Sequence, residues 1–175
     1  MKIINFVFII VTFFILMDCN KSSDPIDQPF ECNSENNPIN FTFKYGVAVK
    51  NILNTSECTF QKDLVLDPPI VTNLKLTVEE LDSVFALMQR IDFFDYPDTF
   101  YTNAQSDTIA VITPSAKYYY HVEIASLCKE LYWNDSILYP DTLAEKLRNL
   151  NHLIINIIQS KKAYQNLPAA RGGYD

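Results

Sequence analysis

The chain has 175 residues, 48% of them hydrophobic, and it carries a formal net charge of -7 at pH 7. Its length and apolar content suffice for a single domain with a continuous core, and its negative charge excludes binding to nucleic acid, which requires a basic face. With only 3 glycines and 2 histidines, the sequence also lacks a phosphate-binding loop, a dinucleotide fingerprint and a zinc site of the HExxH type, so we expect no cofactor and no metal.

The N-terminal segment has the layout of an export signal. An almost wholly apolar run from Phe6 to Met17 is shorter than the roughly 20 residues of a membrane-spanning helix, and it ends at Leu16-Met17-Asp18-Cys19. This sequence resembles the bacterial lipoprotein signal, in which a leucine stands three residues before the cysteine that receives the lipid. The resemblance implies a signal peptide over residues 1–18 and acyl chains on Cys19, and therefore an anchor in the outer membrane or at the cell surface. An ordinary secretory signal cut nearby is the alternative.

The segment that follows, residues 19–40, is rich in Asn, Ser, Asp and Pro, which is typical of a tether between an anchor and a domain. If Cys19 is acylated, three of the 4 cysteines remain, so at most one internal disulfide forms and one thiol is left over. Cys58 can pair with either of its neighbours in the sequence, Cys32 or Cys128. We take Cys32 and Cys58 as the candidate disulfide.

The first half of the domain alternates apolar and polar residues in short runs and then changes to helical spacing. A helix is expected over residues 78–91, because Thr77-Val78-Glu79-Glu80 is a capping box and apolar residues recur every three or four positions after it. A turn is expected at Asp67-Pro68-Pro69, since proline cannot donate to a sheet ladder. Strands, the last two of which form an antiparallel hairpin, are predicted over residues 41–45, 59–66 and 70–76.

The second half has the same order after a polar loop over residues 98–107. A turn is expected at Pro114-Ser115, and strands are predicted over residues 109–113, 118–124 and 128–133. A second capping box, Thr142-Leu143-Ala144-Glu145, opens a helix with an apolar stripe of Leu143, Leu147, Leu150, Ile154 and Ile157. The expected fold is a single α+β domain over residues 41–175, in which an antiparallel sheet of about six strands packs against two amphipathic helices.

Strand 118–124 carries the strongest candidate for chemistry. Alternation places Tyr119, His121 and Glu123 on one face at a repeat of about 7 Å, so that a carboxylate can orient an imidazole. The sequence identifies no nucleophile, oxyanion donor or metal partner for this pair, and the polar outer face of a half-buried strand accounts for the same pattern. His152 falls opposite the apolar stripe of its helix, where it should be exposed and alone.

The 10 tyrosines and 12 phenylalanines can fill a core or present rings to a sugar or a protein partner. The mature region resembles a group of Bacteroidetes lipoproteins of unassigned activity, a resemblance carried by Phe43-Lys44-Tyr45-Gly46, Lys62-Asp63-Leu64, Asp92-Phe93-Phe94-Asp95-Tyr96-Pro97 and the tail from Leu167 to Tyr174. It brings no activity with it. We therefore expect a non-enzymatic binding module of the cell envelope, with the membrane as one partner through the lipid and a protein or glycan as the other. The alternative is an envelope hydrolase or thiol enzyme that uses His121 and Glu123, with Cys58 or Cys128 as the thiol.

Overall fold

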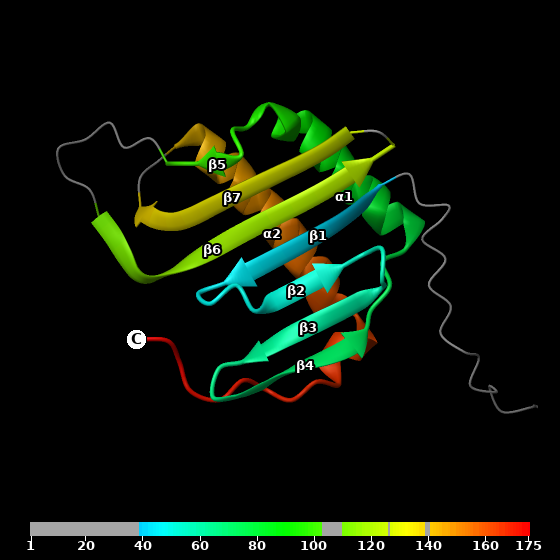
Figure 1. Ribbon diagram of the computed structural model, residues 1–175, viewed down its shortest axis with the longest axis vertical. Helices are drawn as coiled ribbons and strands as arrows, with labels where there is room; N and C mark the ends of the chain where they lie inside the picture. Colours follow the sequence, from blue (N-terminus) through cyan, green and yellow to red (C-terminus); the bar gives the residue numbers. More distant parts are fainter. Residues whose placement is uncertain (1–38, 103–109, 126, 139–140) are drawn as a thin grey trace, which may run out of the picture.

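The computed structural model describes residues 39–102, 110–125, 127–138 and 141–175, and these residues form an α+β fold (Figure 1). Seven strands form one sheet in the order β4-β3-β2-β1-β6-β7-β5. The strands are β1 (Asn40–Gly46), β2 (Asn51–Asn54), β3 (Thr59–Leu64), β4 (Asp67–Asn73), β5 (Thr99–Phe100), β6 (Ala110–Ile124) and β7 (Leu127–Leu138). The helices are α1 (Val78–Arg90), α2 (Thr142–Ser160) and the short α3 (Lys162–Gln165), with a 3-10 turn η1 (Phe93–Asp95). None of the described helices is long and apolar enough to cross a membrane.

The described sheet is mixed rather than antiparallel. Neighbouring strands run antiparallel from β4 to β7, whereas β5 pairs with β7 in parallel. The expectation of about six antiparallel strands and two helices is therefore corrected to seven strands and a third, short helix. The sequence pattern misses β2 because its 4 residues are too few to show alternation, and it misses β5 because its 2 residues lie in a polar segment.

Two of the predicted turns lie inside strands. The turn between β3 and β4 is at Val65 and Leu66, where Val65 has a left-handed φ of 64°, and both prolines of the expected turn belong to β4. Prolines are tolerated there because β4 is an edge strand and its ladder with β3 shifts register between the Leu64–Asp67 and Lys62–Ile70 pairs, where both prolines lie. Pro114 lies within β6, which is continuous across the cis Thr113–Pro114 bond and shifts register against β7 between Val111 and Ala116.

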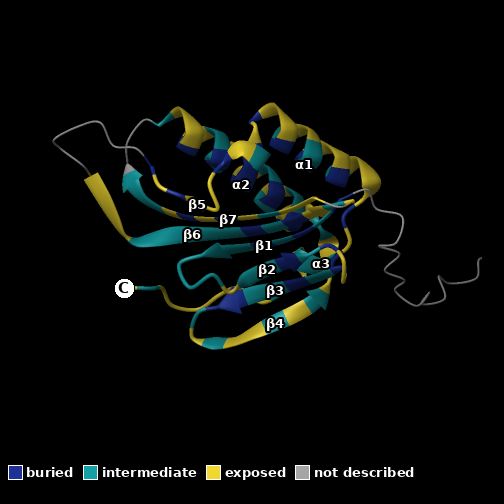
Figure 2. Ribbon diagram, turned by 45° about the horizontal axis from the view of Figure 1, so that its top comes forward, coloured by how far each residue is buried: buried dark blue, intermediate teal, exposed yellow. Residues whose placement is uncertain are grey.

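Helices α1 and α2 cover one face of the sheet, and the core lies between the two layers (Figures 1 and 2). Alternate residues of the central strands point into this core and are buried, namely Phe41 and Phe43 on β1, Tyr120 and Val122 on β6, and Leu131 and Trp133 on β7. Among the described residues, no helix or strand covers the opposite face of the sheet. The side chains between the buried positions therefore form a bare surface over β1, β6 and β7.

Both long helices begin near their predicted capping signals. Thr77 caps α1 as expected, since its hydroxyl accepts from the Glu80 amide at 3.3 Å and its own amide donates to Glu80 Oε2 at 2.7 Å. Helix α2 is capped by Asp141 instead of Thr142, because the Asp141 carboxylate accepts from the second and third amides of the helix at 2.8 and 3.1 Å. The expected apolar stripe also changes: Leu143 is 46% exposed, and the buried residues are Ala144, Leu147, Leu150, Asn151, Ile154 and Ile158.

The residues after α3 run along the hairpin of β3 and β4. Arg171 forms an isolated parallel bridge with Val65, and its guanidinium is hydrogen-bonded to the Asp67 carboxylate. The Tyr174 hydroxyl donates to Asp63 on β3. These contacts hold the C-terminal segment against one end of the sheet.

Candidate functional site

The candidate site lies on the bare face of the sheet, where three strands place their outward side chains next to one another. On β6, His121 is directly opposite Thr42 of β1 and Glu130 of β7. One step further along the same face, Glu123 is opposite Cys128. Because directly opposed residues have Cβ atoms about 5 Å apart, this register brings four chemically active side chains within reach of each other.

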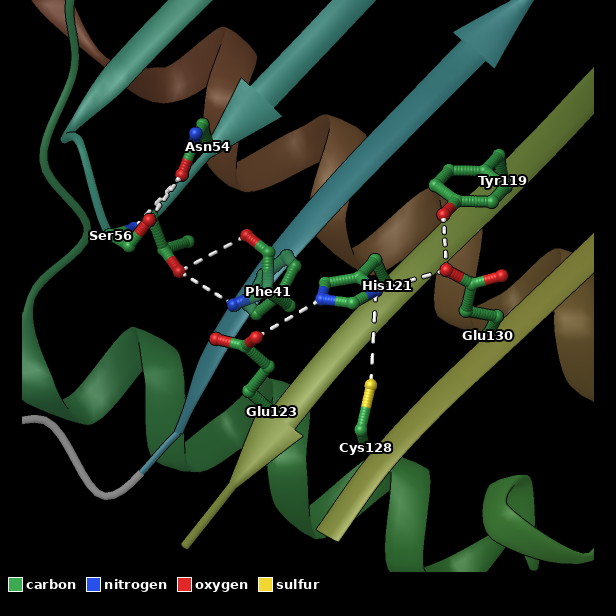
Figure 3. Close-up of polar contacts among 9 residues, drawn as sticks. Phe41, Asn54, Ser56, Tyr119, His121, Glu123, Cys128 and Glu130 are labelled. Atoms are coloured by element: carbon green, nitrogen blue, oxygen red, sulfur yellow. Dashed lines mark hydrogen bonds and ion pairs between the residues drawn. The ribbon is translucent and has the colours of Figure 1, made fainter. Parts of the chain in front are cut away.

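His121 is the centre of the cluster, and both of its ring nitrogens have partners (Figure 3). Nε2 lies 3.2 Å from Oε1 of Glu123, and Nδ1 lies 3.3 Å from Oε1 of Glu130. The Sγ atom of Cys128 is 4.0 Å from the same Nδ1. The imidazole is thus placed between a carboxylate on one side and a carboxylate and a thiol on the other.

A second group of contacts extends the cluster along β6 and β7. The Tyr119 hydroxyl donates to Glu130 Oε1 at 3.0 Å, so this carboxylate oxygen is shared by Tyr119 and His121 (Figure 3). Tyr132 lies directly opposite Tyr119 on β7 and is 38% exposed. From β1, the ammonium group of Lys44 sits 5.0 Å from the centre of the Tyr119 ring. The surface therefore combines two tyrosines with charges of both signs.

The carboxylates determine the protonation behaviour of the site. The pKa of His121 is raised above its ordinary value, first by the hydrogen bond to Glu123 and also by Glu130, while partial burial opposes the change. The imidazole is about one third exposed, at 32%, and both glutamates are more than half exposed. The pKa of Tyr119 is raised as well, first by burial and then by its hydrogen bond to Glu130. The cluster therefore favours the imidazolium form of His121 and keeps Tyr119 neutral as a donor.

A shallow polar depression of about 170 Å³ lies beside the imidazole, on the side of Glu123. It is lined by Asn40, Phe41, Thr42, Ser56, His121 and Glu123. The segment that borders it is fixed by Thr55, whose hydroxyl accepts from the Phe41 amide at 2.8 Å. A larger depression of about 220 Å³, mostly apolar, lies elsewhere on the molecule between the end of α1 and the start of α2, with Ile91, Tyr96 and Leu143 in its lining.

The structure brings together the two residues that the sequence named, His121 and Glu123. It adds Glu130, which sequence reasoning did not place beside them, and of the two candidate thiols, Cys58 and Cys128, it places Cys128 there. The signal that could have found them is the short hairpin between β6 and β7: once Ile124 is paired with Leu127, alternation puts Cys128 and Glu130 on the face of His121. Within the described residues, no group of three or more His, Cys, Asp or Glu side chains is arranged to hold a metal ion.

The cysteines take different roles. Cys58 is disulfide-bonded and buried, so it is not the thiol of a catalytic cluster, whereas Cys128 is free and exposed. Cys32, the candidate partner of Cys58, and the acylation candidate Cys19 lie outside the described residues. His152 lies on an exposed position of α2, away from the cluster. No protein-family model, no curated protein and no solved structure matches the chain.

Proposed function

We propose that this chain is a lipid-anchored protein of the cell envelope whose bare sheet face binds a glycan. The anchor part of the proposal is supported by the signal-like segment that ends at Cys19. The binding part is supported by the face centred on Tyr119, His121, Glu130 and Tyr132, which we call the tyrosine face. The single observation that carries the proposal is the direct cross-strand pairing of Tyr119 with Tyr132 on a face that no described element covers.

The side chains of the tyrosine face suit a sugar. Tyrosine rings offer flat apolar area at a low cost in side-chain entropy, and they can stack on the apolar side of a sugar ring. The side chains of Glu123 and Glu130 are more than half exposed, and their carboxylates can accept hydrogen bonds from hydroxyl groups. The Tyr119 hydroxyl, whose proton goes to Glu130, can accept a hydrogen bond from a sugar hydroxyl on the same surface.

A protein ligand fits the same surface less well. The centre of a protein interface is depleted of charged residues, and Lys and Glu in particular are rare there. The tyrosine face has the opposite character, because Glu130 lies at its centre and Lys44 and Glu123 lie beside it. Charges that would have to be desolvated beneath a protein can remain hydrated beside a sugar.

The binding test uses the purified full chain on an array of envelope-type oligosaccharides, followed by titration calorimetry with the oligosaccharide that binds. We expect Tyr132→Ala to weaken binding by about threefold to tenfold, which corresponds to roughly 0.5–1.5 kcal/mol for one aromatic stacking contact. The control is Leu143→Ala, which shortens an exposed side chain in the apolar depression and should leave binding unchanged. Equal losses in both variants, or binding to a protein fraction alone, would refute glycan binding at this face.

The anchor is tested separately by growing cells with a clickable palmitate analogue. We expect the label to appear on the native chain and to be lost in Cys19→Ser, with the protein moving from the membrane to the aqueous fraction. Mass spectrometry should find a mature chain that begins at Cys19. A chain that carries no lipid, or that retains residues 1–18, contradicts the anchor and leaves the binding proposal standing.

A further inference from the structure

Cys128, His121 and Glu123 are arranged in the order of a nucleophile, a base and the group that orients the base. Cys128 Sγ is 4.0 Å from Nδ1 of the imidazole, and Glu123 Oε1 is 3.2 Å from Nε2 on the far side of the ring (Figure 3). A carboxylate that accepts from Nε2–H leaves Nδ1 free to take a proton, and nucleophile–base contacts are often long when no substrate is bound. Cys128 is also exposed, so a small reagent can reach its sulfur.

We propose that Cys128 is a site of thiol–disulfide exchange for low-molecular-weight disulfides that carry positive charge. The inference does not require glycan binding: it shares His121 and Glu130 with the tyrosine face, but its reacting atom is the sulfur of Cys128, which lies outside that face. Neither Cys58, which is disulfide-bonded, nor any other cysteine of the described residues offers a competing thiol.

The reaction needs no reagent besides the disulfide. In the reactive form the proton of the Cys128 thiol lies on Nδ1 of His121, and the thiolate attacks one sulfur of the incoming disulfide. A new disulfide forms between Cys128 and that sulfur while the original sulfur–sulfur bond breaks. The leaving thiolate takes the proton from the imidazolium and departs as a thiol. The products are therefore a mixed disulfide on Cys128, one free thiol and neutral His121.

The charges around the sulfur select the substrate. The groups that face His121 and Cys128 are Tyr119 and Glu123 from β6 and Glu130 from β7. On β1, the outward residues Asn40 and Thr42 do not titrate, and the cationic Lys44 lies further along the face, against the Tyr119 ring. Two carboxylates next to one imidazolium leave an excess of negative charge, to which the net charge of -7 of the whole chain adds. A cationic disulfide is attracted to this surface and an anionic one is repelled.

Glu130 has a second effect, because its Oε1 lies 3.3 Å from the nitrogen that Cys128 uses. It competes with the sulfur for the Nδ1 proton and lowers the share of molecules in which the thiolate and the imidazolium are paired. When Glu130 is replaced by Gln, Glu123, the first cause of the raised pKa of His121, remains and still favours the imidazolium that pairs with the Cys128 thiolate. Glu130→Gln should therefore react faster than the native chain with an uncharged disulfide.

The experiment follows the reaction of the purified full chain with cystamine at pH 6, with the modified cysteine assigned by peptide mapping. We expect modification at Cys128, none there in Cys128→Ser, and a rate at least roughly fivefold lower in His121→Asn, since an isolated thiol is under about 1% ionised at this pH. His152→Asn removes an exposed histidine elsewhere and should react at the native rate. The rate of His121→Asn should fall about tenfold per pH unit below pH 8, while that of the native chain should fall less steeply.

The charge selection is tested with three disulfides of similar size: cystamine, 2-hydroxyethyl disulfide and dithiodipropionate. One unit of charge about 6 Å from a carboxylate in water changes the rate about threefold, so cystamine should react fastest and the dianion slowest. In Glu130→Gln the rates of the three disulfides should differ less from one another. Equal rates for the native chain and His121→Asn, with circular dichroism showing both folded, would overturn the proposal, as would a preference for the dianion.

Discussion

The strand that carries Tyr119 and His121 is fixed from beneath by a buried hydrogen bond, and breaking this bond tests how the site is held. The hydroxyl of Tyr120 donates to Oδ1 of Asn151 on α2, and both residues are at most 1% exposed. Tyr120→Phe removes the donor and leaves the amide oxygen buried without it. Asn151→Leu removes the acceptor and leaves the hydroxyl. Tyr120→Phe together with Asn151→Leu removes both polar groups at nearly constant volume.

The expected free energies follow from the cost of a buried polar group that has lost its partner. Each single substitution should lower the free energy of unfolding by about 1–3 kcal/mol, because the remaining group is not solvated in the core. The double variant should lie within about 1 kcal/mol of the native chain, since replacing both partners by apolar groups can be nearly neutral. The coupling energy between the two positions is therefore expected to be about 1–3 kcal/mol.

The assay is urea unfolding of the four proteins of this cycle under oxidising conditions, so that the disulfide of Cys58 stays intact. The urea midpoints are compared only among variants whose free energy of unfolding has the same dependence on urea concentration, because a changed dependence would signal a change in the denatured state. If the double variant loses as much free energy of unfolding as the two single variants together, the hydrogen bond does not hold β6 against α2. A coupling energy of the expected size would instead identify this hydrogen bond as the contact that positions the site.

Three further predictions concern the cap, an ion pair and the imidazole. Thr77→Ala should lower the free energy of unfolding by about 1 kcal/mol in urea titrations, because the Glu80 amide loses its acceptor, and an unchanged midpoint would refute the capping role. Arg148→Lys should cost roughly 1–2 kcal/mol in the same assay, because a lysine cannot reproduce the two hydrogen bonds of 3.0 and 2.6 Å to the Asp135 carboxylate. For His121 the folded pKa is raised, so its contribution to stability is fully present below the unfolded pKa and is lost as pH rises through the folded value. His121→Asn should therefore lower the free energy of unfolding by more at pH 5.5 than at pH 8. A loss that is the same at both pH values would contradict a raised pKa of His121.

The sequence predicts α1 with its cap, the existence of α2, and strands within β3, β4, β6 and β7, because these elements carry local signals. Capping residues and strict alternation act over a few neighbouring positions, and the structure confirms the elements that have them. The ends of the strands are less well predicted. The third expected strand was extended through Leu76, whereas β4 ends at Asn73, because the alternating Leu74 and Leu76 reach the core from an irregular segment.

The candidate site is only half visible in the sequence. Tyr119, His121 and Glu123 are recognisable as one face of one strand, because they are separated by single residues. Glu130 joins them only through the register of the neighbouring strand, which depends on the length of the turn after Ile124. The position of β1 between β6 and β2 adds Lys44 from a segment far away in the chain. Contacts of this kind are set by strand order, for which the sequence has no local signal.

The most direct test of the account is to map the bound ligand on the folded domain by nuclear magnetic resonance. The isotope-labelled chain is titrated with the oligosaccharide selected on the array, and changes in amide chemical shift are followed residue by residue. We predict that the changes cluster at Thr42, His121, Glu130 and Tyr132, on the outward side of β1, β6 and β7. Changes concentrated instead around the apolar depression at Ile91 and Leu143 would contradict the claim that the bare sheet face is the binding surface.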